Sequence, residues 1–151
     1  MFRKFHGAVV LAFLAVFFVG FSGEASQAFA KAPIVKVHVD ISSQSMSVWV
    51  NGSNFGNWPV STGRKGFDTP RGSFTVKRTA RVYFSKKYDD APMPNAVFFY
   101  GGYAIHGTSK VRALGRQASH GCIRLHPADA ADFYELVQDY GLASTRVTIT
   151  N

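Results

Sequence analysis

Cys122 is the only cysteine of this 151-residue chain, and it lies in the stretch SHGCIRLH, residues 119–126. A free cysteine is often a small buried hydrophobe. Cationic neighbours such as Arg124, together with a nearby helix start, instead lower the pKa of a thiol and favour the nucleophilic thiolate. Gly121 allows a substrate to approach closely, and the backbone N–H groups of Gly121 and Cys122 are placed to stabilise an oxyanion. The stretch therefore predicts a cysteine nucleophile.

A cysteine nucleophile needs a base that the fold holds beside it. His106 is the best candidate because it ends the apolar stretch YGGYAIH and is followed by GTS. A strand with this pattern would deliver His106 to the mouth of a loop, where functional residues are concentrated. A histidine satisfied within the core is the alternative interpretation.

The other histidines of the domain suit different roles. His120 is too close to Cys122 in sequence to swing onto it, and is expected to shape the turn or contact a substrate. His126 precedes a proline and is a candidate helix cap, while His38 lies in a strand pattern and is expected to be structural or on the surface. Cys122 with His106, His120 and His126 offers zinc ligand types, but the spacing matches no closed structural site. We therefore expect no metal and no cofactor.

The elements that must position these residues are mostly strands. Residues 34–41 and 45–50 alternate apolar and polar side chains, and Asn51-Gly52 predicts a hairpin between strands. Residues 55–61 continue the pattern, with Pro59 indicating an edge or a strand end. Three more segments have strand character, the first two as pairs of short strands: 73–84, 96–106 and 144–150. Two segments are expected to be loops that wall the site: 62–72 and 85–95.

Helical periodicity occurs in one segment, residues 127–141, where apolar side chains recur at helical spacing: Phe133, Leu136, Val137 and Tyr140. Pro127 suits the first helical position, Asp129 the first turn, and Gly141 a C-terminal cap. Many short strands and one helix in the C-terminal half predict a mainly β domain, a sandwich or a barrel-like sheet with the helix packed against it.

The first thirty residues have the pattern of an export signal. Arg3 and Lys4 precede the apolar run 8–21, and Ala28-Phe29-Ala30 offers a cleavage site. The run is shorter than the about 20 residues that span a bilayer. We expect residues 1–30 to be a cleaved signal peptide, with an uncleaved anchor as the alternative. Residues 31–151 would then be one domain in the periplasm or cell envelope, without an integral membrane segment.

Export also affects how the single cysteine and the net charge are interpreted. An unpaired cysteine in an oxidising compartment is a liability unless its reactivity is used. Without Arg3, Lys4 and Glu24, the 17 basic and 9 acidic residues become 15 and 8, a net charge of about +7. This surface suits an anionic cell-wall polymer better than nucleic acid, although ordinary solubility explains it equally well.

Two stretches, YAIHGT (103–108) and LGRQASHGCIRL (114–125), closely resemble the signature of the YkuD-type L,D-transpeptidases. Residues 39–76 are similar to the family's opening strands, its PVSTG stretch and its TPxGxF loop. The resemblance covers roughly residues 35–150. It implies an L,D-transpeptidase-like β-sandwich with one helix that acts on bacterial peptidoglycan.

The resemblance also implies roles for individual residues. Cys122 would be the nucleophile, His106 its base, and the backbone carbonyl of Gly107 the group that orients the imidazole. The remaining motif residues would form the oxyanion and substrate-binding site: Ser119, His120, Gly121 and Arg124. In that family Arg124 would support the loop or meet a substrate carboxylate.

The implied reaction is a two-step acyl transfer. A tetrapeptide stem would form a thioester with Cys122 and release D-alanine, and an amine would then take the acyl group. The amine could belong to another stem, giving a 3→3 cross-link, to a D-amino acid, or to an outer-membrane or wall-attached protein. Water as the acceptor would make the protein an L,D-carboxypeptidase or an amidase. A non-catalytic wall-binding domain with an inert cysteine is the alternative from a different class.

Overall fold

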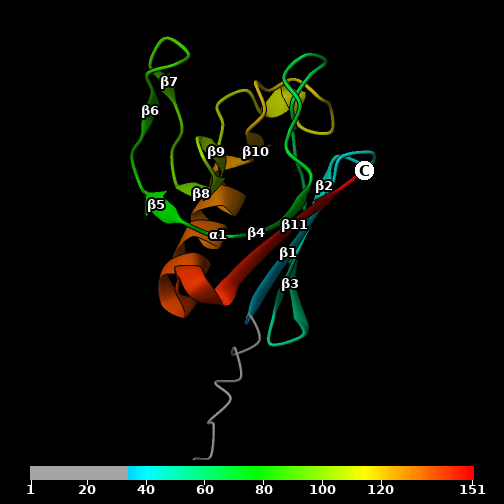
Figure 1. Ribbon diagram of the computed structural model, residues 1–151, viewed down its shortest axis with the longest axis vertical. Coiled ribbons are helices and arrows are strands. Elements are labelled where there is room, and N and C mark those ends of the chain that lie inside the picture. The colour runs from blue at the N-terminus through cyan, green and yellow to red at the C-terminus, as the bar shows by residue number, and fades with distance from the viewer. Residues whose placement is uncertain (1–33) are drawn as a thin grey trace, which may run out of the picture. The chain divides into compact units, whose positions relative to one another are not determined.

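Strands are the main regular secondary structure of the computed structural model, which describes residues 34–151 (Figure 1). The expected signal peptide, residues 1–30, lies outside the described residues, so its cleavage stays a prediction. Over residues 34–151, no helix is both long enough and apolar enough to cross a membrane.

One sheet contains the first and last strands of the domain side by side. It has five strands in the order β3-β2-β1-β11-β4. Their bounds are β1 Val35–Asp40, β2 Ser45–Val50, β3 Ser53–Pro59, β4 Gly72–Thr75 and β11 Thr145–Thr150. The central strand β1 runs antiparallel to β2 and parallel to β11. The predicted hairpin is confirmed, with φ of 50° at Asn51 and 86° at Gly52, and β3 is an edge strand that ends at Pro59 as expected.

A second sheet carries the residues of the sequence motif. It has the order β10-β9-β8-β5. Its strands are β5 Arg78–Ala80, β8 Ala96–Tyr100, β9 Tyr103–Gly107 and β10 Ile123–Leu125. The pair β8–β9 around Gly101-Gly102 was predicted, whereas β10 was not, since three residues are too few for a periodic signal. A two-stranded hairpin, β6 Phe84–Ser85 with β7 Ala91–Pro92, lies mostly in the predicted loop 85–95.

The prediction of a strand pair in residues 73–84 is wrong in one respect. Strands β4 and β5 occur there, but they do not pair with each other. Strand β4 pairs with β11 and strand β5 with β8, so the two belong to different sheets. Val76 lies between these two strands in the sequence, and its side chain is buried in the core. The chain crosses from one sheet to the other at this residue. This crossing links the two layers of the sandwich.

The core lies between the sheets and the helix. Val35, Val37 and Val39 of β1 are buried, while the intervening Lys36 and His38 face outward, as alternation in a strand requires. The helix α1 (Pro127–Tyr140) contacts β9 and β8, and its apolar side places Phe133 and Val137 in the same core. This mainly β sandwich with one helix confirms the predicted fold class (Figure 1).

The helix ends are those that the sequence predicts. Pro127 is the first helical residue, and the His126 side chain caps the helix by accepting a hydrogen bond at Nδ1 from the Ala128 N–H, at 3.3 Å. Gly141 ends it with a φ of 89°. Tyr140, expected on the buried side, is instead 37% exposed because it lies in the last turn.

Candidate active site

The pairing of β9 with β10 brings two distant parts of the motif together. The strands are parallel, with Ile105 opposite Ile123 and His106 opposite Arg124. Both isoleucines are buried in the core. Because side chains alternate along a strand, His106 and Arg124 point to the other face, and so does Cys122, two residues before Arg124. Cys122 and His106 line the same cavity, so the thiol and the imidazole share one small area.

His106 is held in a fixed orientation and a fixed proton state. Its Nδ1 lies 2.7 Å from the Gly107 carbonyl oxygen. Since that oxygen only accepts, Nδ1 carries the proton and Nε2 is left as a free acceptor. Burial lowers the pKa of His106 to about 4, with the charge of Arg124 acting in the same direction and the Gly107 hydrogen bond opposing it. The imidazole is therefore neutral at pH 7.

Gly107 has no room for a side chain. A Cβ there would lie 3.3 Å from both Ala130 and Pro94 and 3.5 Å from Pro127, so β9 is packed tightly against the start of α1. The Gly107 N–H donates to the Pro94 carbonyl at 2.9 Å. Gly107, whose carbonyl orients His106, is thus held both by packing against the start of α1 and by the hydrogen bond of its own N–H.

The environment of Cys122 differs from the one expected from its cationic neighbours. Burial raises the pKa of the Cys122 thiol, because the side chain packs on a small apolar cluster that includes Met93 and Ala104. A hydrogen bond from the Ala104 N–H and the charge of Arg124 act the other way but are outweighed. The prediction of a lowered thiol pKa is therefore wrong. Thiol and imidazole are both neutral in the resting site.

The turn before Cys122 is organised by Ser119, which is fully buried. The Ser119 hydroxyl donates to the Cys122 carbonyl at 2.6 Å and accepts from the Gly121 N–H at 3.0 Å. The expectation that the Gly121 N–H is free to meet an oxyanion is therefore not met, since the Ser119 hydroxyl already occupies it. Gly121 instead provides space: its φ is 107°, and a Cβ would lie 2.5 Å from the Tyr103 ring.

The predicted loop 62–72 supports this turn from behind. Thr69 is buried; its hydroxyl donates to the Gly121 carbonyl and accepts from the Gly63 N–H, both at 2.9 Å. Strand β10 is held on its free side by Ser61, which exchanges two backbone hydrogen bonds with Arg124 at 2.9 and 3.0 Å. The loop supplies no residue to the cavity lining among residues 34–151, so only the second predicted wall is correct.

His120 joins two loops through its ring. Tyr88 stacks on it with ring centroids 4.5 Å apart, and Phe67 meets it edge-on at 4.8 Å. Burial lowers the pKa of His120, and the charges of Arg64, Arg124 and Lys110 act in the same direction. As expected, His120 shapes the turn and faces the cavity.

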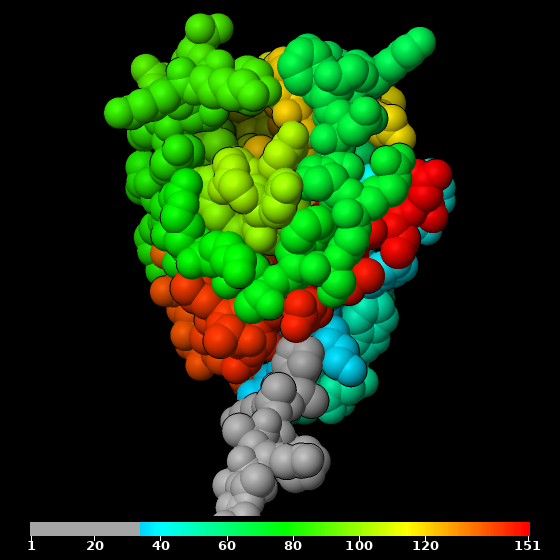
Figure 2. Space-filling model, viewed as in Figure 1, coloured from blue at the N-terminus to red at the C-terminus, as the bar shows by residue number. Residues whose placement is uncertain are grey.

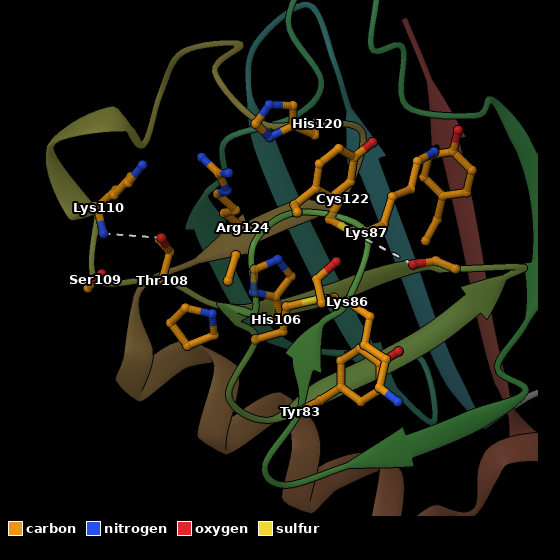
Figure 3. A pocket seen from close by; sticks show the side chains of 17 residues that line it. Tyr83, Lys86, Lys87, His106, Thr108, Ser109, Lys110, His120, Cys122 and Arg124 are labelled. Atoms are coloured by element: carbon orange, nitrogen blue, oxygen red, sulfur yellow. Dashed lines mark hydrogen bonds between the residues drawn. The ribbon is translucent and has the colours of Figure 1, made fainter.

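A cavity of about 500 Å³ collects these groups. Figure 2 shows the surface hollowed beside the green β6–β7 segment, with yellow and orange atoms of the motif inside it. Cys122, His106, His120 and Arg124 line it (Figure 3), while the backbone of Gly107 and Gly121 and the hydroxyl of Ser119 support it. His126 lies outside it at the helix cap. Within residues 34–151, no three His, Cys, Asp or Glu side chains are grouped as metal ligands.

Sequence reasoning missed most of the side chains on the cavity walls. They come from the β6–β7 hairpin, the start of β9 and the loop after it, and include Tyr83, Lys86, Lys87, Tyr103 and Lys110. The hairpin was expected to wall the site, but its individual residues carry no motif. The lysines were visible only as scattered charge.

Comparisons with known proteins agree with this architecture. The profile of the YkuD family, described as the L,D-transpeptidase catalytic domain, matches residues 35–149. In Bacillus subtilis, the relative named "Putative L,D-transpeptidase YkuD" is 26% identical over 117 residues, covering 75% of this chain and 64% of that protein. An L,D-transpeptidase structure from Mycobacterium tuberculosis has a TM-score of 0.70 at 27% identity, covering 79% of this chain and 58% of that one. Another, from Stackebrandtia nassauensis, has a TM-score of 0.69 at 26% identity, covering 83% and 62%.

The sandwich with a thiol and an imidazole in one cavity is thus the fold of L,D-transpeptidase domains. The chain belongs to the YkuD family, and residues 35–149 are its L,D-transpeptidase catalytic domain. It spans less than two thirds of the length of the Bacillus subtilis relative and of these two solved chains.

Proposed function

We propose that this domain is a peptidoglycan L,D-transpeptidase with Cys122 as its nucleophile and His106 as its base. The observation that carries the proposal is the placement of both side chains on one face of the β9–β10 pair, in one cavity. The Gly107 carbonyl, which holds Nδ1, leaves Nε2 of His106 to take a proton.

The first step forms a thioester. The Cys122 sulfur attacks the carbonyl that joins the third stem residue, a diamino acid, to D-alanine, while its proton passes to Nε2 of His106. The backbone N–H of Cys122 stabilises the oxyanion, since that of Gly121 is already used. The carbon–nitrogen bond breaks, His106 returns the proton to the leaving nitrogen, and D-alanine departs.

The second step reverses these roles. An acceptor amine loses its proton to His106 and attacks the thioester, and the sulfur leaves and recovers the proton. The energy of the broken peptide bond is retained in the thioester, so no nucleotide is needed. The acceptor is another stem in a 3→3 cross-link, a D-amino acid, or an outer-membrane or wall-attached protein.

A defined substrate tests both steps. Purified protein is incubated with a tetrapeptide muropeptide, with and without an added amine acceptor, and the products are weighed by mass spectrometry. We expect loss of D-alanine and a cross-linked dimer. A tripeptide alone would instead assign water as the acceptor, and with it an L,D-carboxypeptidase or amidase.

A covalent probe tests the nucleophile separately. The structural relative L,D-transpeptidase 3 from Mycobacterium tuberculosis was solved with a faropenem-derived adduct, at 26% identity and a TM-score of 0.68. We expect faropenem to add one adduct to the folded protein and none to Cys122→Ala. An adduct on the alanine variant, or labelling only after denaturation, would favour the inert cysteine of a wall-binding domain.

We further propose that the domain works in the periplasm or cell envelope after cleavage behind Ala30. The pattern of residues 1–30 supports this location, because a basic start, a short apolar run and a small-residue site are typical of export signals. Sequencing the N-terminus of the protein from the envelope fraction tests it. A chain that still begins at Met1 in that fraction would indicate an uncleaved anchor.

A further inference from the structure

The charge of the cavity walls is one-sided. Four cationic side chains line the cavity and no aspartate or glutamate does: Lys86, Lys87, Lys110 and Arg124. Asp89 and Asp90 lie at the exposed tip of the β6–β7 hairpin and do not line the cavity. None of these four cations therefore has an acidic partner on the cavity lining.

The cations lie on two opposite walls. Figure 3 shows Lys110 on one side, beside Thr108 and Ser109, and Lys86 and Lys87 on the other, with Arg124 between them. Lys110 is positioned through its backbone, which donates to the Thr108 hydroxyl at 3.1 Å. The Lys87 ammonium lies 5.4 Å from the centre of the Tyr88 ring, which stacks on His120.

The half-buried Arg124 also lacks a counter-ion. Its guanidinium donates to the Ala118 carbonyl at 3.3 Å, and the single ion pair within residues 34–151 joins Arg81 and Glu135 elsewhere. Removing a charge from water without an opposite charge is unfavourable. A ligand that brings negative charge to both walls would relieve this cost.

We propose that Lys86, Lys87 and Lys110 make this cavity selective for acyl donors whose diamino acid carries a free carboxylate, over donors in which that carboxylate is an amide. The inference rests on the proposed function for the identity of the donor, and it concerns recognition only. The reacting carbonyl lies at Cys122, and the lysines on either wall meet the carboxylates on either side of it.

Binding without turnover provides the test. Full chains carrying Cys122→Ala are titrated by calorimetry with the tetrapeptide L-Ala-γ-D-Glu-meso-diaminopimelyl-D-Ala and with its diaminopimelyl amide. Lys110→Gln is added to this chain in one variant, and Lys86→Gln together with Lys87→Gln in another. The chain without these lysine substitutions is the parent. Lys36→Gln, on the outer face of β1, is the matched control for Lys110→Gln because each removes one positive charge and Lys36 does not line the cavity.

We expect the parent to bind the free carboxylate more tightly, and at least one set of lysine variants to weaken that binding by about threefold to fivefold. The lysine variants should bind the amide about as tightly as the parent does. Lys36→Gln should leave the affinity for either peptide nearly unchanged. Equal affinity of the parent for both peptides, no measurable binding of either, or the same loss in the Lys36 variant would overturn the proposal.

Faropenem labelling of the chain with Cys122 intact separates the two hypotheses. A labelled protein without carboxylate preference refutes the selectivity and leaves the transpeptidase proposal standing. A carboxylate preference in a protein that faropenem does not label refutes the transpeptidase proposal and leaves the selectivity standing.

Discussion

At the scale of single residues, the site is built for neutral partners. Burial raises the pKa of Cys122 and lowers that of His106, and both shifts oppose a resting thiolate–imidazolium pair. In the proposed reaction the proton would then move as the sulfur attacks, so His106 would act as a general base rather than as the counter-ion of a preformed thiolate.

The first prediction concerns the pH dependence of acylation. Because His106 has a pKa of about 4, the rate constant for faropenem acylation should fall to half only as the pH drops to near 4. A series of stopped-flow or mass measurements from acid to neutral pH would give the midpoint. A midpoint near 6.5, the ordinary histidine value, would contradict the buried neutral imidazole.

The second prediction concerns stability. The unfolded chain protonates His106 below about pH 6.5, whereas the folded chain does so only below about 4, so between these values the unfolded state binds more protons. The free energy of unfolding therefore rises with pH across this window, by roughly 3 kcal/mol from this residue.

Urea unfolding at several pH values can isolate that contribution. His106→Gln should show a flatter dependence between pH 4 and 6.5 than the parent. Parallel curves for the parent and His106→Gln would mean that His106 does not stay neutral on folding.

At the scale of elements, the turn before β10 is held by the hydroxyls of Ser119 and Thr69. Ser119 satisfies both the Gly121 N–H and the Cys122 carbonyl, and Thr69 of the loop 62–72 holds the Gly121 carbonyl from the other side. Cys122 is thus positioned by two side chains that do not line the cavity.

The third prediction removes the Ser119 hydroxyl. Ser119→Ala leaves the buried Gly121 N–H without an acceptor, which should destabilise the domain by about 1–3 kcal/mol and slow acylation. Denaturant unfolding and faropenem labelling measure the two effects. Ser109→Ala, exposed at the cavity edge, should change stability by less than about 0.5 kcal/mol. An equal change in both variants would show that the Ser119 hydroxyl is unimportant.

The elements also show what sequence could and could not reveal. Alternation predicted β1 and β2, and the 3.6-residue period predicted α1 with its Pro127 start. Strand β10 was missed because its three residues, at the end of the motif 114–125, are too few to show periodicity, and its partners, β9 and Ser61, are distant in sequence. His106 and Cys122 were found by residue type. The prediction for the pKa of the Cys122 thiol was wrong because this pKa depends on packing against Met93 and Ala104, which only the fold brings close.

At the scale of the whole molecule, β11 unites the first and last parts of the domain. It lies between β1 and β4, and its Val147 and Ile149 are buried in the common core. Strand β4 has no other partner in its sheet, so loss of β11 would expose both neighbours and open the core.

The fourth prediction is that a chain ending at Ser144 does not fold. Circular dichroism and heating should show no cooperative transition, because the sheet loses its second central strand. A chain that begins at Lys31 and keeps β11 should melt like the full chain. Cooperative melting of the chain ending at Ser144 would show that β11 is dispensable.

The parallel pairing of β1 with β11 also sets the timing of assembly. Val35, near the beginning of the described chain, is opposite Thr145, near its end. A growing polypeptide therefore holds β1 half-paired until Thr145–Thr150 have emerged from the ribosome, and closing so long a loop is slow. The five-stranded sheet cannot be completed before β11 has been made, which leaves a period in which the domain can still be threaded through a pore as an extended chain.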